Sequence, residues 1–198
     1  MRTPGTRTVF TFEEDLKECL AVLKNGGVIL YPTDTIWGLG CDATNRTAVE
    51  KIFSIKSREE SKSLLILVDS DSMLGSYVKD IPEIAYELTE VSDKPMTIIY
   101  PSGKNLAPGV CSEDGSVGIR ICSDEFCCEL IKRFRKPIVS TSANISGKPS
   151  PSVFSEIEET VIEAVDYTVK HRRDDRGSGS ASSVIKIELD GTIKILRM

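Results

Sequence analysis

The side chains best suited to bind a ligand gather in one segment, residues 140–150, which reads STSANISGKPS. It is dense in hydroxyl groups and carries an amide and a glycine, a composition that cannot build a hydrophobic core. The short apolar run before it, Pro137-Ile138-Val139, predicts a buried strand. Open α/β sheets bind ligands at the carboxyl ends of their strands, so this segment is a candidate binding loop. The alternative is an ordinary loop between a strand and a helix.

Other polar clusters stand at comparable places in the chain. Thr33 and Thr35 follow an apolar strand predicted for residues 27–31, and Arg120 lies near the end of a strand predicted for residues 117–121. Such strand ends can converge on one crevice of an open sheet. A crevice rich in cations, hydroxyls and amides, without a Ser–His or Cys–His pair, suits a polyanion such as a nucleoside triphosphate. The contributing residues would be Thr33, Thr35, Lys56, Arg58, Lys62, Arg120, Ser140, Ser142 and Asn144.

Each of these side chains also has a structural explanation. Lys56 and Arg58 stand at the end of a helix predicted for residues 45–56, where cations complement the helix dipole for about 0.3–1 kcal/mol. Ser142 and Asn144 could hydrogen-bond their own backbone in a turn. A guanidinium buried in an apolar strand, as predicted for Arg120, needs either a carboxylate or an anionic ligand. Of these two partners we favour the ligand.

The rest of the sequence predicts a single α/β domain with a mixed sheet and helices packed on it. Apolar residues recur at helical spacing after Thr11-Phe12-Glu13-Glu14, which has the spacing of a capping box. Apolar runs without alternation, such as residues 64–68, are typical of strands covered on both faces. A second capping-box spacing, from Ser155 to Glu158, predicts a helix that ends near Ala164.

Composition places the chain among ordinary globular proteins. Its 198 residues are 40% hydrophobic and 28% charged, which fits about one large domain. The net charge of −5 argues against a protein that binds nucleic acid over its whole surface. No apolar run approaches the ~20 residues that span a bilayer, and the N-terminus lacks the apolar region of a signal peptide. We therefore expect a cytoplasmic protein with no membrane contact.

Two common types of site are not indicated. The six cysteines include no Cys-x-x-Cys pair and His171 is the single histidine, which predicts reduced cysteines and no metal site. The chain also has no Gly-x-x-x-x-Gly-Lys-Ser/Thr, and the run Gly177–Ser182 lacks the third glycine of a dinucleotide loop. A P-loop or Rossmann enzyme is therefore a poor fit.

Four segments, taken together, resemble one known family. Tyr31–Gly40, which reads YPTDTIWGLG, resembles the YPTET-x-YGLG segment of the YrdC-like proteins, the threonylcarbamoyl-AMP synthases. Lys56-Ser57-Arg58 resembles the K-x-R motif of that family, Ser142-Ala143-Asn144 its S-x-N motif, and Val117–Arg120 its V-x-V-R strand. Each segment alone is weak evidence. Their common order, from about residue 12 to the C-terminus, is strong evidence.

The resemblance implies a YrdC-like domain over residues 1–198, with an open cationic cleft, with residues 1–10 as an arm or edge strand, and without the extra C-terminal domain of longer members. It implies an enzyme that makes L-threonylcarbamoyl-AMP and pyrophosphate from L-threonine, bicarbonate or CO2, and ATP. Mg2+ would arrive with the ATP. Partner enzymes would use the product for the t6A modification of tRNA, and a direct RNA contact stays open.

The functional residues of the family carry over to matching positions. The catalytic residues would be Lys56, Arg58, Ser142 and Asn144. ATP would contact Arg58, Lys62, Ser116, Ser142, Ser150 and Arg197. Threonine would contact Thr33, Thr35, Arg120, Ser140 and Ser182. The sequence departs from the family pattern at Leu67, Asp93-Lys94 and Ala181, which affects the threonine side more than the nucleotide side.

Two other classes of function are alternatives. A double-stranded RNA-binding or ribosome-maturation factor would use the same cationic hollow, although the net charge of −5 argues against it. A carbamoyl-adenylate-forming domain of the hydrogenase-maturation type would use carbamoyl phosphate. Such domains occur within much longer proteins.

Overall fold

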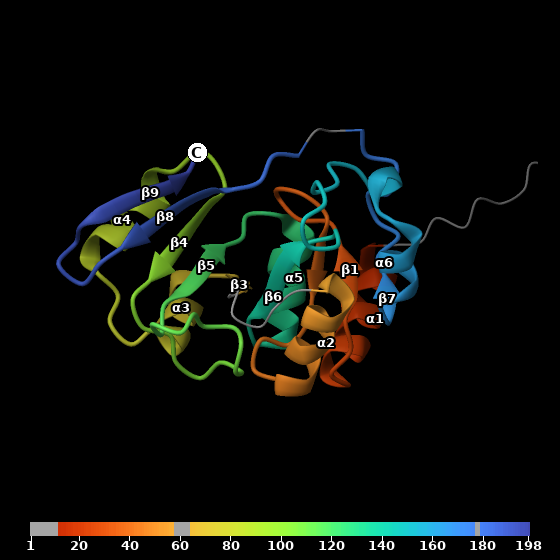
Figure 1. Cartoon of the computed structure of the whole chain (residues 1–198), viewed down its shortest axis with the longest axis horizontal. Helices are drawn as coiled ribbons and strands as arrows, with labels where there is room; N and C mark the ends of the chain where they lie inside the picture. The colour runs from red at the N-terminus through yellow and green to blue at the C-terminus, as the bar shows by residue number, and fades with distance from the viewer. Residues whose placement is uncertain (1–11, 58–63, 177–178) are drawn as a thin grey trace, which may run out of the picture.

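The computed structural model describes residues 12–57, 64–176 and 179–198, which form one mixed, twisted sheet with helices packed on it (Figure 1). The strand order across the sheet of described residues is β7-β1-β2-β6-β3-β5-β4-β8-β9. Parallel and antiparallel pairs both occur: β3 runs parallel to β5 and antiparallel to β6. The predicted α/β class with a mixed sheet is confirmed.

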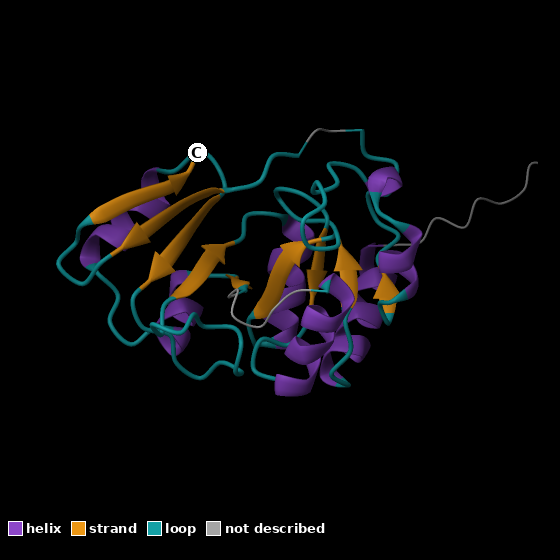
Figure 2. Ribbon diagram, in the orientation of Figure 1, coloured by secondary structure: helices purple, strands orange, loops and turns teal. Residues whose placement is uncertain are grey.

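The strands in the described ranges are β1 (Ile29–Tyr31), β2 (Gly38–Gly40), β3 (Leu65–Val68), β4 (Met96–Tyr100), β5 (Val117–Ile121), β6 (Ile138–Ser142), β7 (Tyr167–Thr168), β8 (Ser183–Ile187) and β9 (Ile193–Arg197). The helices there are α1 (Phe12–Lys24), α2 (Arg46–Lys56), α3 (Asp71–Tyr77), α4 (Glu83–Val91), α5 (Glu125–Phe134) and α6 (Glu159–Glu163), with a 3-10 turn at Phe154–Glu156. Figure 2 shows α1, α2, α5 and α6 gathered at one end of the sheet and α3 and α4 at the other. Within these described ranges no helix is long and apolar enough to span a membrane.

Helix α2 follows its local sequence closely. The side chain of Asn45 caps its first turn by accepting a hydrogen bond from the backbone nitrogen of Ala48 at 3.2 Å. Ser57 ends the helix in the left-handed conformation, with φ of 47°. The helix predicted for residues 45–56 is confirmed. The capping box predicted at Thr11 lies outside the described residues.

The structure corrects two predictions of secondary structure. The strand expected to end at Val139 continues through Ser142, because β2 pairs with it: Gly38 is the cross-strand partner of Ser142. The first hydroxyls of the candidate loop therefore belong to a strand. β2 itself is a strand that the sequence did not predict.

The single helix expected from Ser155 to Ala164 is wrong. Ile157 and Glu158 adopt extended backbone (ψ 129° and 137°), which separates the 3-10 turn from α6. Ile157 is buried, so this break places an apolar side chain in the core. Glu158 makes no side-chain cap, and Glu156 instead accepts a hydrogen bond from the backbone of Ser152 at 2.7 Å.

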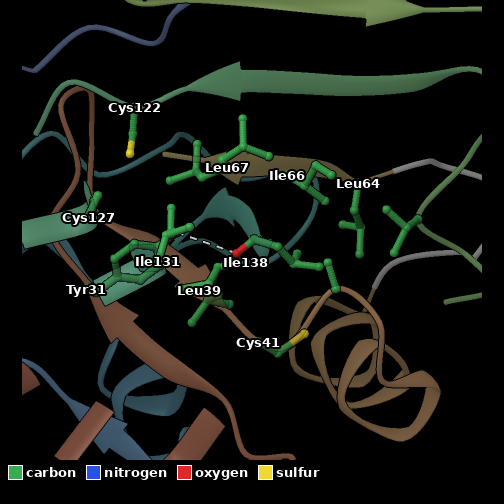
Figure 3. Close-up of a cluster of buried hydrophobic side chains, with 14 of the residues drawn as sticks. Tyr31, Leu39, Cys41, Leu64, Ile66, Leu67, Cys122, Cys127, Ile131 and Ile138 are labelled. Atoms are coloured by element: carbon green, nitrogen blue, oxygen red, sulfur yellow. Dashed lines mark hydrogen bonds between the residues drawn. The ribbon is translucent and has the colours of Figure 1, made fainter. Parts of the chain in front are cut away.

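One face of the sheet changes character along its strands. Leu67 of β3 and Ile138 of β6 are cross-strand partners on this face and are fully buried. Figure 3 shows them in one buried cluster with Cys127 and Ile131 of α5, which packs against β3. Helix α5 therefore covers this part of the face with large apolar side chains.

Further along β6, and on its neighbour β2 and on β5, the side chains on this face become small. Side chains on one face recur every second residue, so Ser140 and Ser142 of β6 continue the row that begins at Ile138. Gly38 pairs with Ser142, and Gly118 pairs with Leu65. Serine and glycine fill little space, and the face is hollow where they replace leucine and isoleucine.

Candidate active site

A cavity of about 400 Å³ occupies this hollow. Its floor consists of direct cross-strand partners: Ser140 with Leu65 on β6 and β3, and Gly118 with Ile99 on β5 and β4. The sequence placed the polar residues at or just past strand ends. The structure places many of them within strands, on one face, where they point into the same cavity.

Seven of the predicted site residues line this cavity: Thr35, Arg120, Ser140, Ser142, Ser150, Ser182 and Arg197. They come from five separate parts of the chain, so folding brings together motifs that are far apart in sequence. Among the described residues, Thr33, Lys56, Ser116 and Asn144 do not line it. The predicted contacts Arg58 and Lys62 lie outside the described residues.

Lys56 supports the loop that follows β6. It is 1% exposed, and its ammonium donates to the carbonyl oxygens of Ser142 at 2.5 Å and Asn144 at 2.8 Å. The backbone nitrogen of Ser146 donates in turn to the carbonyl oxygen of Lys56 at 2.9 Å. The end of α2 is thus fastened to the 142–148 loop (residues 142–148), and the Lys56 side chain is directed at the loop backbone.

Asn144 holds the same loop from inside. Its amide nitrogen donates to the carbonyl oxygens of Ile145 at 3.1 Å and Lys148 at 2.6 Å. Its amide oxygen accepts the hydroxyl of Ser142 at 2.5 Å. Ser142 lines the cavity, so Asn144 sets the direction of a cavity hydroxyl without reaching the cavity itself.

Ser116 has a comparable supporting position. Its hydroxyl and its backbone nitrogen both donate to Asp114, at 2.6 and 2.9 Å, which lowers the pKa of that carboxyl. Its carbonyl oxygen accepts the backbone nitrogen of Ser112 at 2.8 Å. Ser112 lines the cavity, and Ser116 shapes the turn that presents it.

The Thr33–Thr35 turn is closed by its own hydroxyls. The Thr33 hydroxyl donates to the carbonyl oxygen of Ile36 at 2.8 Å and accepts the backbone nitrogen of Thr35 at 3.1 Å. The Thr33 and Thr35 hydroxyl oxygens lie 2.9 Å apart. On its outer side this turn meets Gly179, where an added Cβ would lie 1.7 Å from the Thr35 carbonyl oxygen. Only glycine permits that approach.

Arg120 is paired with a carboxylate. Its Nη2 lies 3.0 Å from Oδ1 of Asp34, and the two side chains are 3% and 7% exposed. The sequence left a choice between a carboxylate and an anionic ligand, and in this structure the partner is the carboxylate. Burial raises the pKa of Asp34, and the Arg120 guanidinium partly offsets that rise.

This ion pair is incompletely hydrogen-bonded. Nε of Arg120 and both carboxylate oxygens of Asp34 are buried and make no well-aligned hydrogen bond within the described ranges. Buried polar groups are nearly always paired, so such atoms call for an explanation. Arg120 also lines the cavity, so its guanidinium lies beside the space that a ligand would occupy.

Sequence reasoning missed Thr97 and Ser112, which both line the cavity. Thr97 lies in β4 between apolar residues and is 2% exposed. Its hydroxyl oxygen lies 2.8 Å from the hydroxyl oxygen of Ser182. A hydroxyl inside an apolar strand was the available signal, although threonine is also a common strand former.

Fold and site together define an α/β protein with a hydroxyl-rich, partly cationic cavity on the open face of a mixed sheet. A family model named Sua5_yciO_yrdC, with the description "Telomere recombination", matches residues 21–198. The chain belongs to the Sua5/YciO/YrdC family.

Curated relatives and a solved structure agree with this assignment. The threonylcarbamoyl-AMP synthase of Pseudoalteromonas translucida is 30% identical over 184 residues, which are 91% of this chain and 97% of the relative. That of Psychromonas ingrahamii is 36% identical over 138 residues, 68% of this chain and 72% of the relative. The structure of P. abyssi Sua5 complexed with L-threonine has a TM-score of 0.79 at 27% identity. It covers 90% of this chain, and this chain spans 52% of that one.

Proposed function

We propose that the protein is an L-threonylcarbamoyladenylate synthase, a nucleotidyltransferase that joins L-threonine, bicarbonate or CO2, and ATP. Relatives that bear this name match most of the chain. The observation that carries the proposal is the convergence of Thr35, Arg120 and Ser182 with the Ser140–Ser142 strand end on one cavity. Arg120 and Arg197 contribute cationic side chains to the lining, which suits anionic substrates.

The chemistry of this reaction fits the side chains. The amine of threonine adds to CO2, and an oxygen of the resulting carbamate attacks the α-phosphorus of ATP, displacing pyrophosphate. The attacking group belongs to the substrate, so no protein nucleophile is required. The protein has to hold two anions together and stabilise charge on the phosphorus oxygens, which is work for fixed hydroxyls, backbone groups and cations.

The cavity divides naturally between the two substrates. The Thr33–Thr35 turn, Arg120, Ser140 and Ser182 would hold threonine. The residues that would contact ATP are Arg58, Lys62, Ser112, Ser142, Ser150 and Arg197. Lys56, Ser116 and Asn144 would act by fixing the loops that carry these contacts, since their polar atoms are engaged with the protein backbone or with Asp114.

Mg2+ would be carried by the phosphates of ATP. Among the described residues that line the cavity, the oxygen donors are hydroxyls and backbone groups, with no carboxylate. Hydroxyls complete the shell of a phosphate-bound Mg2+ but do not form a cage for the free ion. The bound ion would neutralise phosphate charge as pyrophosphate leaves.

We place the product in t6A modification of tRNA, in the cytoplasm, with partner enzymes that accept the adenylate. A mixed anhydride of this type reacts readily with water, so close transfer to a consuming enzyme would protect it. Direct contact with RNA is an independent question that a salt-dependent binding titration addresses.

The decisive experiment measures pyrophosphate release with ATP, threonine and bicarbonate, and with each of the three omitted. Release should require all three, and mass spectrometry should identify threonylcarbamoyl-AMP. Arg120→Met protein purified in parallel controls for contaminating ATPases. Release that continues without threonine would contradict the proposal. Carbamoyl phosphate replacing both threonine and bicarbonate would favour the carbamoyl-adenylate alternative.

A further inference from the structure

Thr97 is a buried polar residue to which the sequence motifs assigned no role in the site. The residues around it in β4 are Met96, Ile98 and Ile99, yet Thr97 lines the cavity and its hydroxyl oxygen lies 2.8 Å from that of Ser182. Both residues are buried, at 2% and 3% exposure. A hydroxyl pair in this place is either a simple solution for two buried polar groups or part of the binding site.

The strands fix this pair rigidly. β4 and β8 are parallel neighbours, with Thr97 opposite Val184, and the backbone nitrogen of Ser183 donates to the carbonyl oxygen of Pro95 at 3.1 Å. Ser182 is also held from the other side, because Nε of Arg197 donates to its carbonyl oxygen at 2.9 Å. The Ser182 hydroxyl is therefore oriented by Thr97 and its backbone by Arg197.

The pair also lies beside Arg120. In the antiparallel register of β4 and β5, Ile98 is opposite Ile119, and continuing it by one residue places Thr97 opposite Arg120. Directly opposed residues have Cβ atoms about 4.5–5.5 Å apart. The guanidinium of Arg120 on β5, the hydroxyl of Thr97 on β4 and the hydroxyl of Ser182, just before β8, are thus neighbours across the sheet. We name this part of the cavity the Arg120 wall (Arg120, Thr97 and Ser182).

We propose that Thr97 is a positioning residue for the amino-acid substrate: it fixes the Ser182 hydroxyl so that this group meets the ligand of Arg120 in one orientation. A hydroxyl has one donor and two acceptor sites, and the Thr97–Ser182 bond uses one of each. Both residues line the cavity. The inference rests on the proposed function and adds to it the residue that prepares the threonine side.

Two substitutions separate the hydroxyl of Thr97 from its shape. Thr97→Val keeps the branched side chain and removes the hydroxyl, whereas Thr97→Ser keeps the hydroxyl. We expect Thr97→Val to raise the KM for threonine about tenfold, the loss of one hydrogen bond, with the KM for ATP within about twofold of the unchanged protein. Thr97→Ser should restore the threonine KM. Thr168→Val, a change in β7 away from the cavity, is the matched control and should leave both constants unchanged.

The route through Ser182 has its own test. Ser182→Ala should raise the threonine KM as Thr97→Val does, and the double variant should be little worse than either single one, because both remove the same oriented hydroxyl. The inference would be overturned if the KM increases of the two single variants multiplied in the double variant. It would also be overturned if the threonine KM of Thr97→Val stayed within twofold, or if Thr97→Val and Thr97→Ser had equal defects. The unchanged protein in the same assay separates this from the proposed function. If its pyrophosphate release does not depend on threonine, the function itself fails and the role of Thr97 with it.

Discussion

On one side of the cavity, the ammonium of Lys56 donates hydrogen bonds to the carbonyl oxygens of Ser142 and Asn144. The side-chain amide of Asn144 donates to two further carbonyl oxygens of the same loop. On the other side, Arg120 and Asp34 face each other with a buried nitrogen and two buried oxygens that lack aligned hydrogen bonds within the described ranges. Both regions are buried and polar. The polar groups of Lys56 and Asn144 are hydrogen-bonded within the protein, whereas Nε of Arg120 has no hydrogen-bond partner among the described residues.

This difference indicates two ways of preparing a site. The nucleotide is large and offers many contacts, so a rigid loop built in advance can bind it without further ordering. Threonine is small, and its carboxylate can supply the missing partner of Arg120. A buried donor without a partner destabilises the protein, and a ligand that pairs with it removes this penalty and so binds more tightly.

The largest effect should follow from breaking the loop. Lys56→Met removes the donor of at least two buried carbonyl oxygens, so we expect the free energy of unfolding to fall by about 3–5 kcal/mol and turnover to fall at least a hundredfold. Urea denaturation and the pyrophosphate assay measure the two effects. Lys51→Met is the matched control on the same helix, because Lys51 is exposed and, among the described residues, donates only to the carbonyl oxygen of Gly26. A loss below 1 kcal/mol in Lys56→Met would mean that the loop does not depend on it.

Breaking the ion pair should cost somewhat less, and in a recognisable pattern. Asp34→Leu leaves the Arg120 charge buried without its partner, with an expected loss of about 3 kcal/mol in the free energy of unfolding. The double variant Asp34→Leu/Arg120→Met should lose less than the sum of its single variants, since it buries no uncompensated charge. Urea titration of the four proteins gives the coupling. Additive losses would show that the two side chains do not act as a pair.

Asn144→Ala should distinguish the two substrates. The change frees the Ser142 hydroxyl and two loop carbonyl oxygens, so we expect turnover to fall about tenfold to a hundredfold and the KM for ATP to rise. The threonine KM should stay within about twofold, the reverse of the pattern expected for Thr97→Val. Steady-state kinetics with each substrate varied in turn provides the comparison. A defect confined to threonine would place the loop on the wrong side of the cavity.

The smallest effect is a pH dependence from Asp34. Burial raises the folded pKa of Asp34 above its ordinary value of 3.8, so over a range of pH above 3.8 the folded protein holds a proton that the unfolded chain releases. The contribution of Asp34 to stability is therefore greatest at low pH and declines as pH rises through that range, by less than about 1.4 kcal/mol per pH unit. As the pH is lowered from 6 to 4, the free energy of unfolding of the unchanged protein should rise relative to that of Asp34→Asn. If the difference in free energy of unfolding between the two proteins does not change with pH, the pKa of Asp34 is not raised by folding.

The sequence predicted the parts of the fold that depend on local patterns. Helix α2 begins at an asparagine cap and ends at Lys56 as expected, since its signals lie within a few residues. β2 could not be predicted in this way. Its three residues, Gly38–Gly40, have little strand propensity and become a strand because β1 and β6 flank them. The Ser155–Glu158 capping box failed because burial of Ile157 outweighed a local capping preference.

The site was predictable as a set of motifs but not as a set of roles. Hydroxyls near strand ends and an arginine in an apolar strand marked the right segments. Which atom meets which partner depends on register, and Asp34 reaches Arg120 across 86 positions of sequence only after β5 is in place. Thr97 escaped notice for the same reason, because its partner Ser182 is 85 residues away.

The contrast between the two sides can be observed atom by atom by NMR. In the free protein, the Arg120 Nε–H should exchange with water faster than the Asn144 side-chain amide, because only the amide donates to protein oxygens within the described residues. Addition of L-threonine should shift the Arg120 Nε–H signal and slow its exchange, while the Asn144 amide signals stay in place. If threonine leaves the Arg120 signal unchanged, or moves both sets equally, the cavity does not have one side built in advance and one side completed by its ligand.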